Sequence, residues 1–110
     1  MQKLNKSYFL VPVIPPQNVT AVSKTSTSIF ITWDAVSSNQ LHGNILGYKV
    51  NWILTGKHGD GETKEFSVAM ANLTGLRRGR RFNLIVFAFN ECGDGPGSDI
   101  IIVKTDKESK

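Results

Sequence analysis

Four arginines in one five-residue run are the side chains of this 110-residue chain best suited to recognition chemistry, Arg77-Arg78-Gly79-Arg80-Arg81. An arginine guanidinium stays charged and can donate two parallel hydrogen bonds to a sulfate, a phosphate or a carboxylate. The chain holds 13 Lys and Arg against 9 Asp and Glu, a net charge of +4, so outside this arginine loop the charges balance. The loop therefore predicts a site for a sulfated glycan or an acidic protein patch. The alternative is a solvated loop whose arginines pair with Glu62, Glu65 or Asp34.

No catalytic constellation accompanies these arginines. The two histidines, His42 and His58, stand beside no nucleophile or acid motif. A single cysteine, Cys92, cannot form an internal disulfide or a cysteine-based zinc site, and we expect it either to bridge to a second chain or to fill a small apolar slot. We expect no enzymatic activity, no metal and no cofactor. Nucleic acid is disfavoured because no aromatic stacking platform is present, and membrane insertion because no apolar stretch approaches about 18 residues.

Three tripeptides match the acceptor pattern for N-linked glycans, and they begin at Asn5, Asn18 and Asn72. About one such match would arise by chance in a chain of this composition. The excess favours a secreted or cell-surface context.

The arginines, the cysteine and the acceptor asparagines are expected to lie on strands or on the loops between them, because the apolar side chains recur at every second residue. The pattern predicts strands over residues 28–33, 47–54 and 82–90, one or two short strands within 62–76, and a last strand over 99–105. Residues 55–61 read as a turn and 91–98 as a long glycine-rich loop. Many short strands within about a hundred residues indicate an all-β, antiparallel sandwich. The predicted core consists of Ile31, Trp33, Tyr48, Val50, Leu76, Phe82, Leu84 and Val86.

From residue 15 to residue 105 the chain resembles a fibronectin type III domain, a seven-stranded immunoglobulin-like Greek-key sandwich. The resemblance rests on elements in a fixed order: Pro16 with Val19 and Val22, then Ile29, Ile31 and Trp33, then Gly47-Tyr48-Lys49-Val50, then Leu73-Thr74-Gly75-Leu76, then Phe82 followed by Leu84, Val86, Ala88 and Asn90, and finally the 93–98 and 103–105 segments. It implies two sheets held together by packing, without disulfides.

Two departures from the family pattern fall at one corner of the expected fold. The family usually has a tyrosine where this chain has Phe82, and its hydroxyl fixes the turn between the fifth and sixth strands. Losing that bond costs about 1 kcal/mol. The family also prefers Pro and Thr where Arg78 and Arg80 stand. We therefore expect this corner to be unlatched and strongly basic. The integrin tripeptide Arg-Gly-Asp is absent from the 91–98 loop, so that activity is not implied.

The family's register predicts a second surface, which is apolar. In that register Ile101 and Val103 point inward, so their neighbours point outward. Six large apolar residues then share the outer face of one sheet, namely Ile53, Ile85, Phe87, Phe89, Ile100 and Ile102. Such a patch indicates homotypic or neighbour-domain packing. The alternative is that the chain's own residues 8–14 cover it.

Together these features predict a single fibronectin type III domain at 15–105, between an N-terminal tail or linker at 1–14 and a C-terminal tail at 106–110. The resemblance is greatest to tandem arrays in neural adhesion molecules and receptor phosphatases. It implies a non-catalytic, extracellular adhesion or protein-interaction module of a multidomain cell-surface or matrix protein. The alternative function is a sulfated-glycan-binding module that uses the arginine loop.

Overall fold

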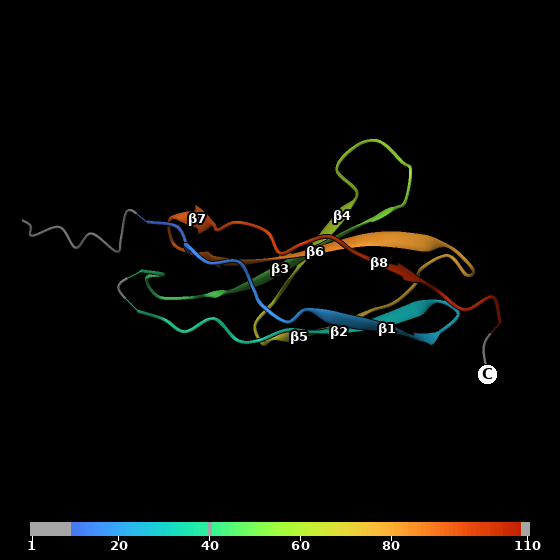
Figure 1. Ribbon diagram of the computed structural model, residues 1–110, viewed down its shortest axis with the longest axis horizontal. Helices are drawn as coiled ribbons and strands as arrows, with labels where there is room; N and C mark the ends of the chain where they lie inside the picture. Colours follow the sequence, from blue (N-terminus) through green and yellow to red (C-terminus); the bar gives the residue numbers. More distant parts are fainter. Residues whose placement is uncertain (1–9, 40, 109–110) are drawn as a thin grey trace, which may run out of the picture.

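Two antiparallel sheets face each other in the computed structural model, which describes residues 10–39 and 41–108 (Figure 1). The first sheet has the order β1-β2-β5, with β1 at Thr20–Thr25, β2 at Ser28–Thr32 and β5 at Met70–Leu73. The second has the order β4-β3-β6-β7, with β8 also paired to β6; its strands are β3 at Gly47–Leu54, β4 at Glu62–Phe66, β6 at Arg81–Asn90, β7 at Gly93–Asp94 and β8 at Ile101–Lys104. The all-β sandwich predicted from the sequence is confirmed. In the described part of the chain, no helix is long and apolar enough to cross a bilayer.

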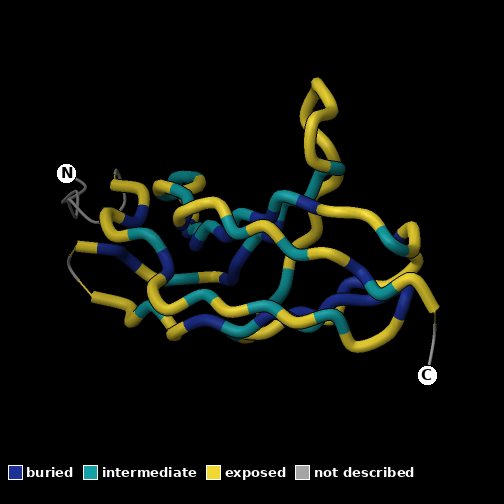
Figure 2. The backbone as a smooth tube through the Cα atoms, turned by 45° about the vertical axis from the view of Figure 1, so that its right-hand side comes forward, coloured by how far each residue is buried: buried dark blue, intermediate teal, exposed yellow. Residues whose placement is uncertain are grey.

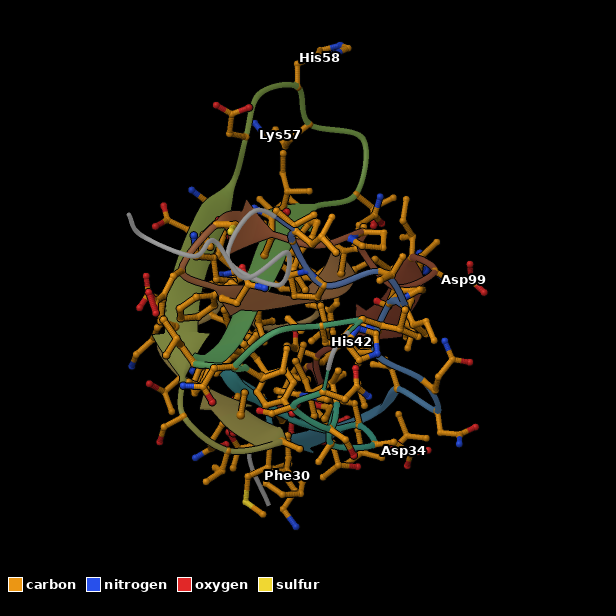
Figure 3. All side chains as sticks on the ribbon, turned by 90° about the vertical axis from the view of Figure 1, so that its left-hand side faces the viewer. Phe30, Asp34, His42, Lys57, His58 and Asp99 are labelled. Atoms are coloured by element: carbon orange, nitrogen blue, oxygen red, sulfur yellow. The ribbon has the colours of Figure 1, made fainter. Side chains whose placement is uncertain are left out.

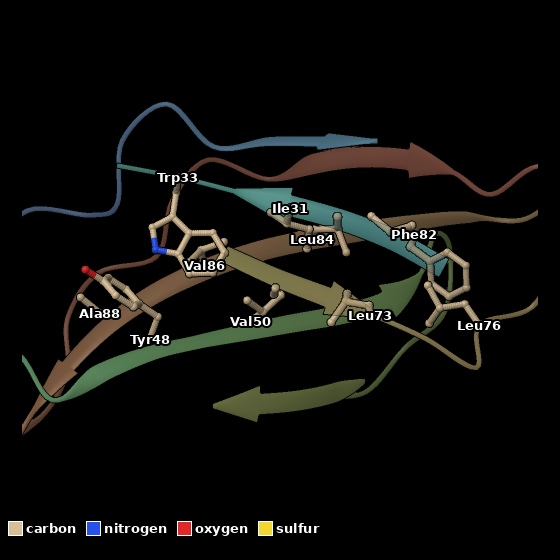
Figure 4. Packing of buried hydrophobic residues seen from close by; sticks show 12 residues of the cluster. Ile31, Trp33, Tyr48, Val50, Leu73, Leu76, Phe82, Leu84, Val86 and Ala88 are labelled. Atoms are coloured by element: carbon tan, nitrogen blue, oxygen red, sulfur yellow. The ribbon is translucent and has the colours of Figure 1, made fainter. Parts of the chain in front are cut away.

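Alternation along the strands builds the core between the sheets. On β6 every second side chain is buried, from Phe82 to Ala88, while those between them lie half-buried on the outer face. All eight expected core residues are buried, and Ile29, Ala71, Leu73 and Ala88 join them (Figure 4). The rings of Trp33 and Tyr48 meet edge to face at 5.3 Å between centroids. Burying each large side chain contributes about 1.5–3 kcal/mol, so packing stabilises the sandwich without a disulfide.

The segment after β6 differs from the long loop expected at 91–98. After a tight turn the chain pairs with β6 again through β7, and then Gly95 N–H donates to Ala88 O and Ser98 N–H to Val86 O. Gly97 leaves room for its neighbours, because a Cβ there would lie 2.7 Å from Ile85 Cδ1. The glycines that read as loop residues thus permit close approach within a strand-like segment. The last strand is consequently divided into β7 and β8.

Residues 10–13, here called the strap, lie against the end of the sandwich beside β7 (Figure 1). Pro12 is fully buried, and a Cβ on Gly95 would lie 2.6 Å from Pro12 O. Asn90 Nδ2 donates to Leu10 O and to His42 O, both at 2.7 Å, and Val13 N–H donates to His42 Nδ1 at 3.1 Å. The strap is therefore tied to the 39–43 turn and to the end of β6. The boundary predicted at residue 14 stays a prediction.

Candidate functional site

The arginine loop is fixed by Thr105, which is 1% exposed. Its hydroxyl donates to Arg77 O at 2.7 Å and accepts from Arg80 N–H at 3.0 Å. The Thr105 N–H donates to Arg80 O, and Gly79 N–H donates to Asp106 O. Phe82 keeps the buried ring and lacks the tyrosine hydroxyl, as expected, but the expectation that the corner is therefore unlatched is wrong, because the Thr105 hydroxyl bridges Arg77 and Arg80.

All four arginine side chains are exposed. Within residues 10–39 and 41–108 the ion pair Lys49–Asp94 is the only one, so no arginine pairs with a carboxylate there. Asp34, one of the predicted partners, instead accepts a hydrogen bond from Asn18 Nδ2 at 2.6 Å. The arginine loop thus presents four guanidinium groups with no carboxylate at ion-pair distance among the described residues.

Two grooves flank the arginine loop and share Lys57. One, of about 480 Å³, is lined by Lys57, Arg80 and Arg81 together with residues 54–56 and Gly79. The other, of about 420 Å³, is lined by Lys57, His58 and Arg77, by Glu62, and by apolar residues that include Phe82. Lys57 and His58 belong to the exposed 55–61 loop, which stands away from the sandwich (Figures 2 and 3).

Two further lysines extend this positive surface. Lys104 lies directly opposite Arg81 in the β6–β8 pairing, and both side chains are exposed. Lys107 lies against Gly79. We call the whole set the basic pole; its members are Lys57, Arg77, Arg78, Arg80, Arg81, Lys104 and Lys107. Sequence patterns could not assign the three lysines to it, because they lie in other segments and meet the arginine loop only after folding.

The apolar surface lies on the outer face of β3 and β6. Asn51 faces Ile85 and Lys49 faces Phe87 across the pairing, while Ile53 and Ile102 lie on either side of Asn83. Of the six predicted residues, Ile53, Ile85, Phe87 and Phe89 are half-buried, whereas Ile100 and Ile102 are 62% and 57% exposed. The register thus places the residues on β3 and β6 and Ile102 on one face, as predicted. The residues most open to solvent, however, are Ile102 on β8 and Ile100 just before that strand.

An ion pair between Lys49 and Asp94 lies at one end of this apolar surface. Lys49 Nζ lies 2.9 Å from Asp94 Oδ1 and 5.3 Å from the centroid of the Phe89 ring. The hydrogen bond to Asp94 raises the pKa of Lys49 above its ordinary value. Lys49 therefore stays charged at neutral pH and covers part of Phe89.

Three other predictions concern the glycan acceptors, the cysteine and metal binding. Of the glycan acceptors, Asn18 and Asn72 are exposed, and Asn5 lies outside the described residues. Cys92 is half-buried, and its N–H donates to Asn90 Oδ1 at 2.8 Å. No group of three or more potential metal ligands occurs in the described part of the chain.

Comparison with known proteins gives the fold and these surfaces a family context. The family model for the fibronectin type III domain matches residues 14–104. The chain is 37% identical over 101 residues to protein sidekick-1 of Gallus gallus, covering 86% of this chain and 5% of that protein. It is 32% identical over 99 residues to tyrosine-protein phosphatase Lar of Drosophila melanogaster and 32% identical over 101 residues to cell adhesion molecule DSCAM of Homo sapiens, in each case covering 89% of this chain and 5% of the relative.

Solved structures agree with the sequence relatives. The FN5 domain of Drosophila Lar matches with a TM-score of 0.67 at 32% identity, over 87% of this chain and 98% of that one. The fn3 domain of human contactin 1 matches with a TM-score of 0.79 at 24% identity, over 90% of this chain and 82% of that one, and supports the fold alone. With a family model that matches nearly its whole length and a sandwich of the same topology, the chain belongs to the fibronectin type III family.

Proposed function

We propose that the chain is one non-catalytic, extracellular module of a larger cell-surface protein and that it acts by contacting other proteins. The observation that carries this proposal is the pattern of relatedness. Nearly the whole chain aligns with proteins that include a named cell adhesion molecule, yet it spans only 5% of the length of those relatives. Because a fold hosts many functions, the site must be argued from the surfaces of this chain.

The outer face of β3, β6 and β8 is the surface that best fits a protein partner. Exposed large apolar residues that cluster on one sheet face commonly mark an interface. Ile102 is 57% exposed and lies in register with Asn83, next to the half-buried Ile85 on β6. A second copy of the chain is the partner that can be tested directly.

Sedimentation velocity tests this interface, with Ile102→Lys as the disrupting variant. We expect the wild type to self-associate at high concentration and Ile102→Lys to be monomeric, because the new charge would be buried without a partner. Val22→Lys is the matched control, since Val22 is 54% exposed on the outer face of the other sheet. A strictly monomeric wild type, or equal effects of the two variants, would contradict self-association through this face.

The basic pole supports a second function, the binding of a sulfated glycan. Arg81 and Lys104 face each other across β6 and β8, and like charges in that position repel. A bound polyanion would relieve this repulsion, and guanidinium groups match sulfate geometry. The two grooves that meet at Lys57 would seat neighbouring stretches of one linear chain.

Heparin-column chromatography tests the glycan function. We expect Arg80→Ala, Arg81→Ala and Lys57→Ala each to elute at lower salt than the wild type, since ionic contacts at exposed sites are screened by salt. Lys64→Ala is the control, because Lys64 is an exposed lysine on the edge strand β4, opposite Val50, and does not belong to the basic pole. Elution of the wild type at or below about 0.15 M salt would contradict the proposal, as would an equal loss in the control.

A further inference from the structure

We propose that Asn72 carries an N-linked glycan and that Asn18 does not, so that the outer face of the β1-β2-β5 sheet is sugar-covered. The inference rests on the extracellular location proposed above. It adds a modification site and assigns a role to the face opposite the apolar surface.

The acceptor tripeptide at Asn72 begins on β5, which ends at Leu73. Leu73 is 2% exposed and points into the core, whereas Asn72 and Thr74 on either side of it are exposed. Asn72 is opposite in direction to Leu73 on the strand, and Thr74 is exposed directly after the strand ends, so both the amide and the hydroxyl are open to solvent. Neither side chain makes a hydrogen bond to any described residue. Both groups that define the acceptor are therefore accessible in the folded domain.

The tripeptide at Asn18 is also exposed, but its two polar groups are occupied. Asn18 Nδ2 donates to Asp34 Oδ2 at 2.6 Å, and Thr20 Oγ1 lies 3.0 Å from Thr32 Oγ1. The backbone at Asn18 has φ of 56°, which is the left-handed region. Because a hydrogen bond to a carboxylate is among the stronger ones, the Asn18 amide is held where a sugar would have to attach.

The surroundings of Asn72 are suited to the first sugar. Phe30 on β2 is paired directly with Val22 on β1 and with Asn72 on β5. The Cβ atoms of directly paired residues lie about 5.5 Å apart, so Phe30 is next to Asn72. Phe30 points away from the sandwich (Figure 3). Val22 and Met70 are 54% and 49% exposed, which leaves an apolar surface beside the acceptor. The carbon-bound hydrogens of a sugar ring can pack on this aromatic and aliphatic surface and remove it from water.

The modification itself is a group transfer from a polyisoprenyl-diphosphate-linked oligosaccharide. A bond forms between Asn72 Nδ2 and C1 of the first sugar, while the bond from C1 to the diphosphate oxygen breaks. The leaving diphosphate keeps that electron pair, and Nδ2 loses one proton to solvent or base. No oxidant or reductant is needed.

The test is secretion of the full 110-residue chain, behind a cleavable signal peptide, from a eukaryotic cell line, followed by peptide mapping with and without peptide-N-glycosidase. We expect most molecules to carry glycan at Asn72, which the enzyme converts to aspartate, and the Asn18 peptide to be unmodified. Asn72→Gln and Thr74→Ala should each abolish the Asn72 glycan, whereas Asn18→Gln should leave it unchanged. Secreted wild type with an unmodified Asn72, or with glycan chiefly on Asn18, overturns the inference.

A second measurement tests the contact with Phe30. Removing the glycan enzymatically should lower the Tm of the wild type and have a smaller effect on Phe30→Ser, because that variant has lost the ring on which the sugar packs. An equal change in both proteins would contradict the Phe30 contact. The added signal peptide places the chain in the secretory pathway, so these two tests do not depend on the proposed functions. If either test fails, the sedimentation and heparin experiments still decide those functions.

Discussion

Replacing Asn90 with alanine is expected to lower the free energy of unfolding by about 3 kcal/mol. Asn90 is 5% exposed and makes three hydrogen bonds to backbone groups, on Leu10, His42 and Cys92. Alanine would remove all three bonds and leave the His42 carbonyl without this partner in a buried site, where an unsatisfied group costs about 1–3 kcal/mol, while the two part-buried bonds add smaller losses. Chemical denaturation followed by tryptophan fluorescence measures the change.

The control for Asn90 lies on the same strand. Asn83 is half-buried on the outer face of β6, where its Oδ1 accepts from Thr55 Oγ1 at 2.6 Å. Since water can replace that partner, Asn83→Ala should cost about 1 kcal/mol or less. Deleting residues 1–13 should also reduce the cost of Asn90→Ala, because one of its three bonds goes to the strap. Equal costs in the full and shortened chains would contradict the role of Asn90 in holding the strap.

Replacing Thr105 with valine is expected to lower the free energy of unfolding by about 2 kcal/mol and to weaken heparin retention. Valine keeps the shape of threonine, so the loss reports the hydroxyl that joins Arg77 O and Arg80 N–H. Without that bridge the arginine loop can move, and ordering it on a ligand then costs conformational entropy. Denaturation and heparin elution measure the two effects on one variant.

Thr105→Ser provides the matched control. Serine keeps the hydroxyl and removes one buried methyl group, which costs about 1 kcal/mol. Its heparin elution should therefore equal that of the wild type. If Thr105→Ser loses more stability than Thr105→Val, or if Thr105→Val elutes with the wild type, the hydroxyl does not fix the arginine loop.

The glycan at Asn72 and the two candidate binding surfaces divide the exterior of the sandwich. Sugar would cover the β1-β2-β5 face, leaving the β3-β6-β8 face open to a protein and the basic pole to a polyanion. Asn72 lies on the other sheet, so Asn72→Gln should act independently of Ile102→Lys and Arg80→Ala, whereas Ile102 lies only two residues from Lys104 of the basic pole on β8.

The sequence by itself determined the sandwich, its core and the position of its excess charge. Alternation at period two depends only on strand geometry, so β6 could be divided into buried and outward side chains from its own residues. The four arginines adjoin in sequence, so their common loop was equally evident. The last strand was partly misjudged, because a glycine that permits close packing, such as Gly97, has the same sequence signature as one that makes a turn.

Only the tertiary structure decided what holds and completes the sites. Thr105 meets Arg77 from 28 residues away, and Asn90 meets Leu10 from 80 residues away. Lys57 and Lys104 reach the arginine loop from two other segments. Local periodicity records which side of a strand is apolar, but hydrogen bonds between distant residues depend on strand order and register across the sheets. Strand order and register are set by the packing of the whole chain. The arginine loop could therefore be predicted from the sequence, whereas the Thr105 hydrogen bonds that hold it and the lysines that complete the basic pole could not.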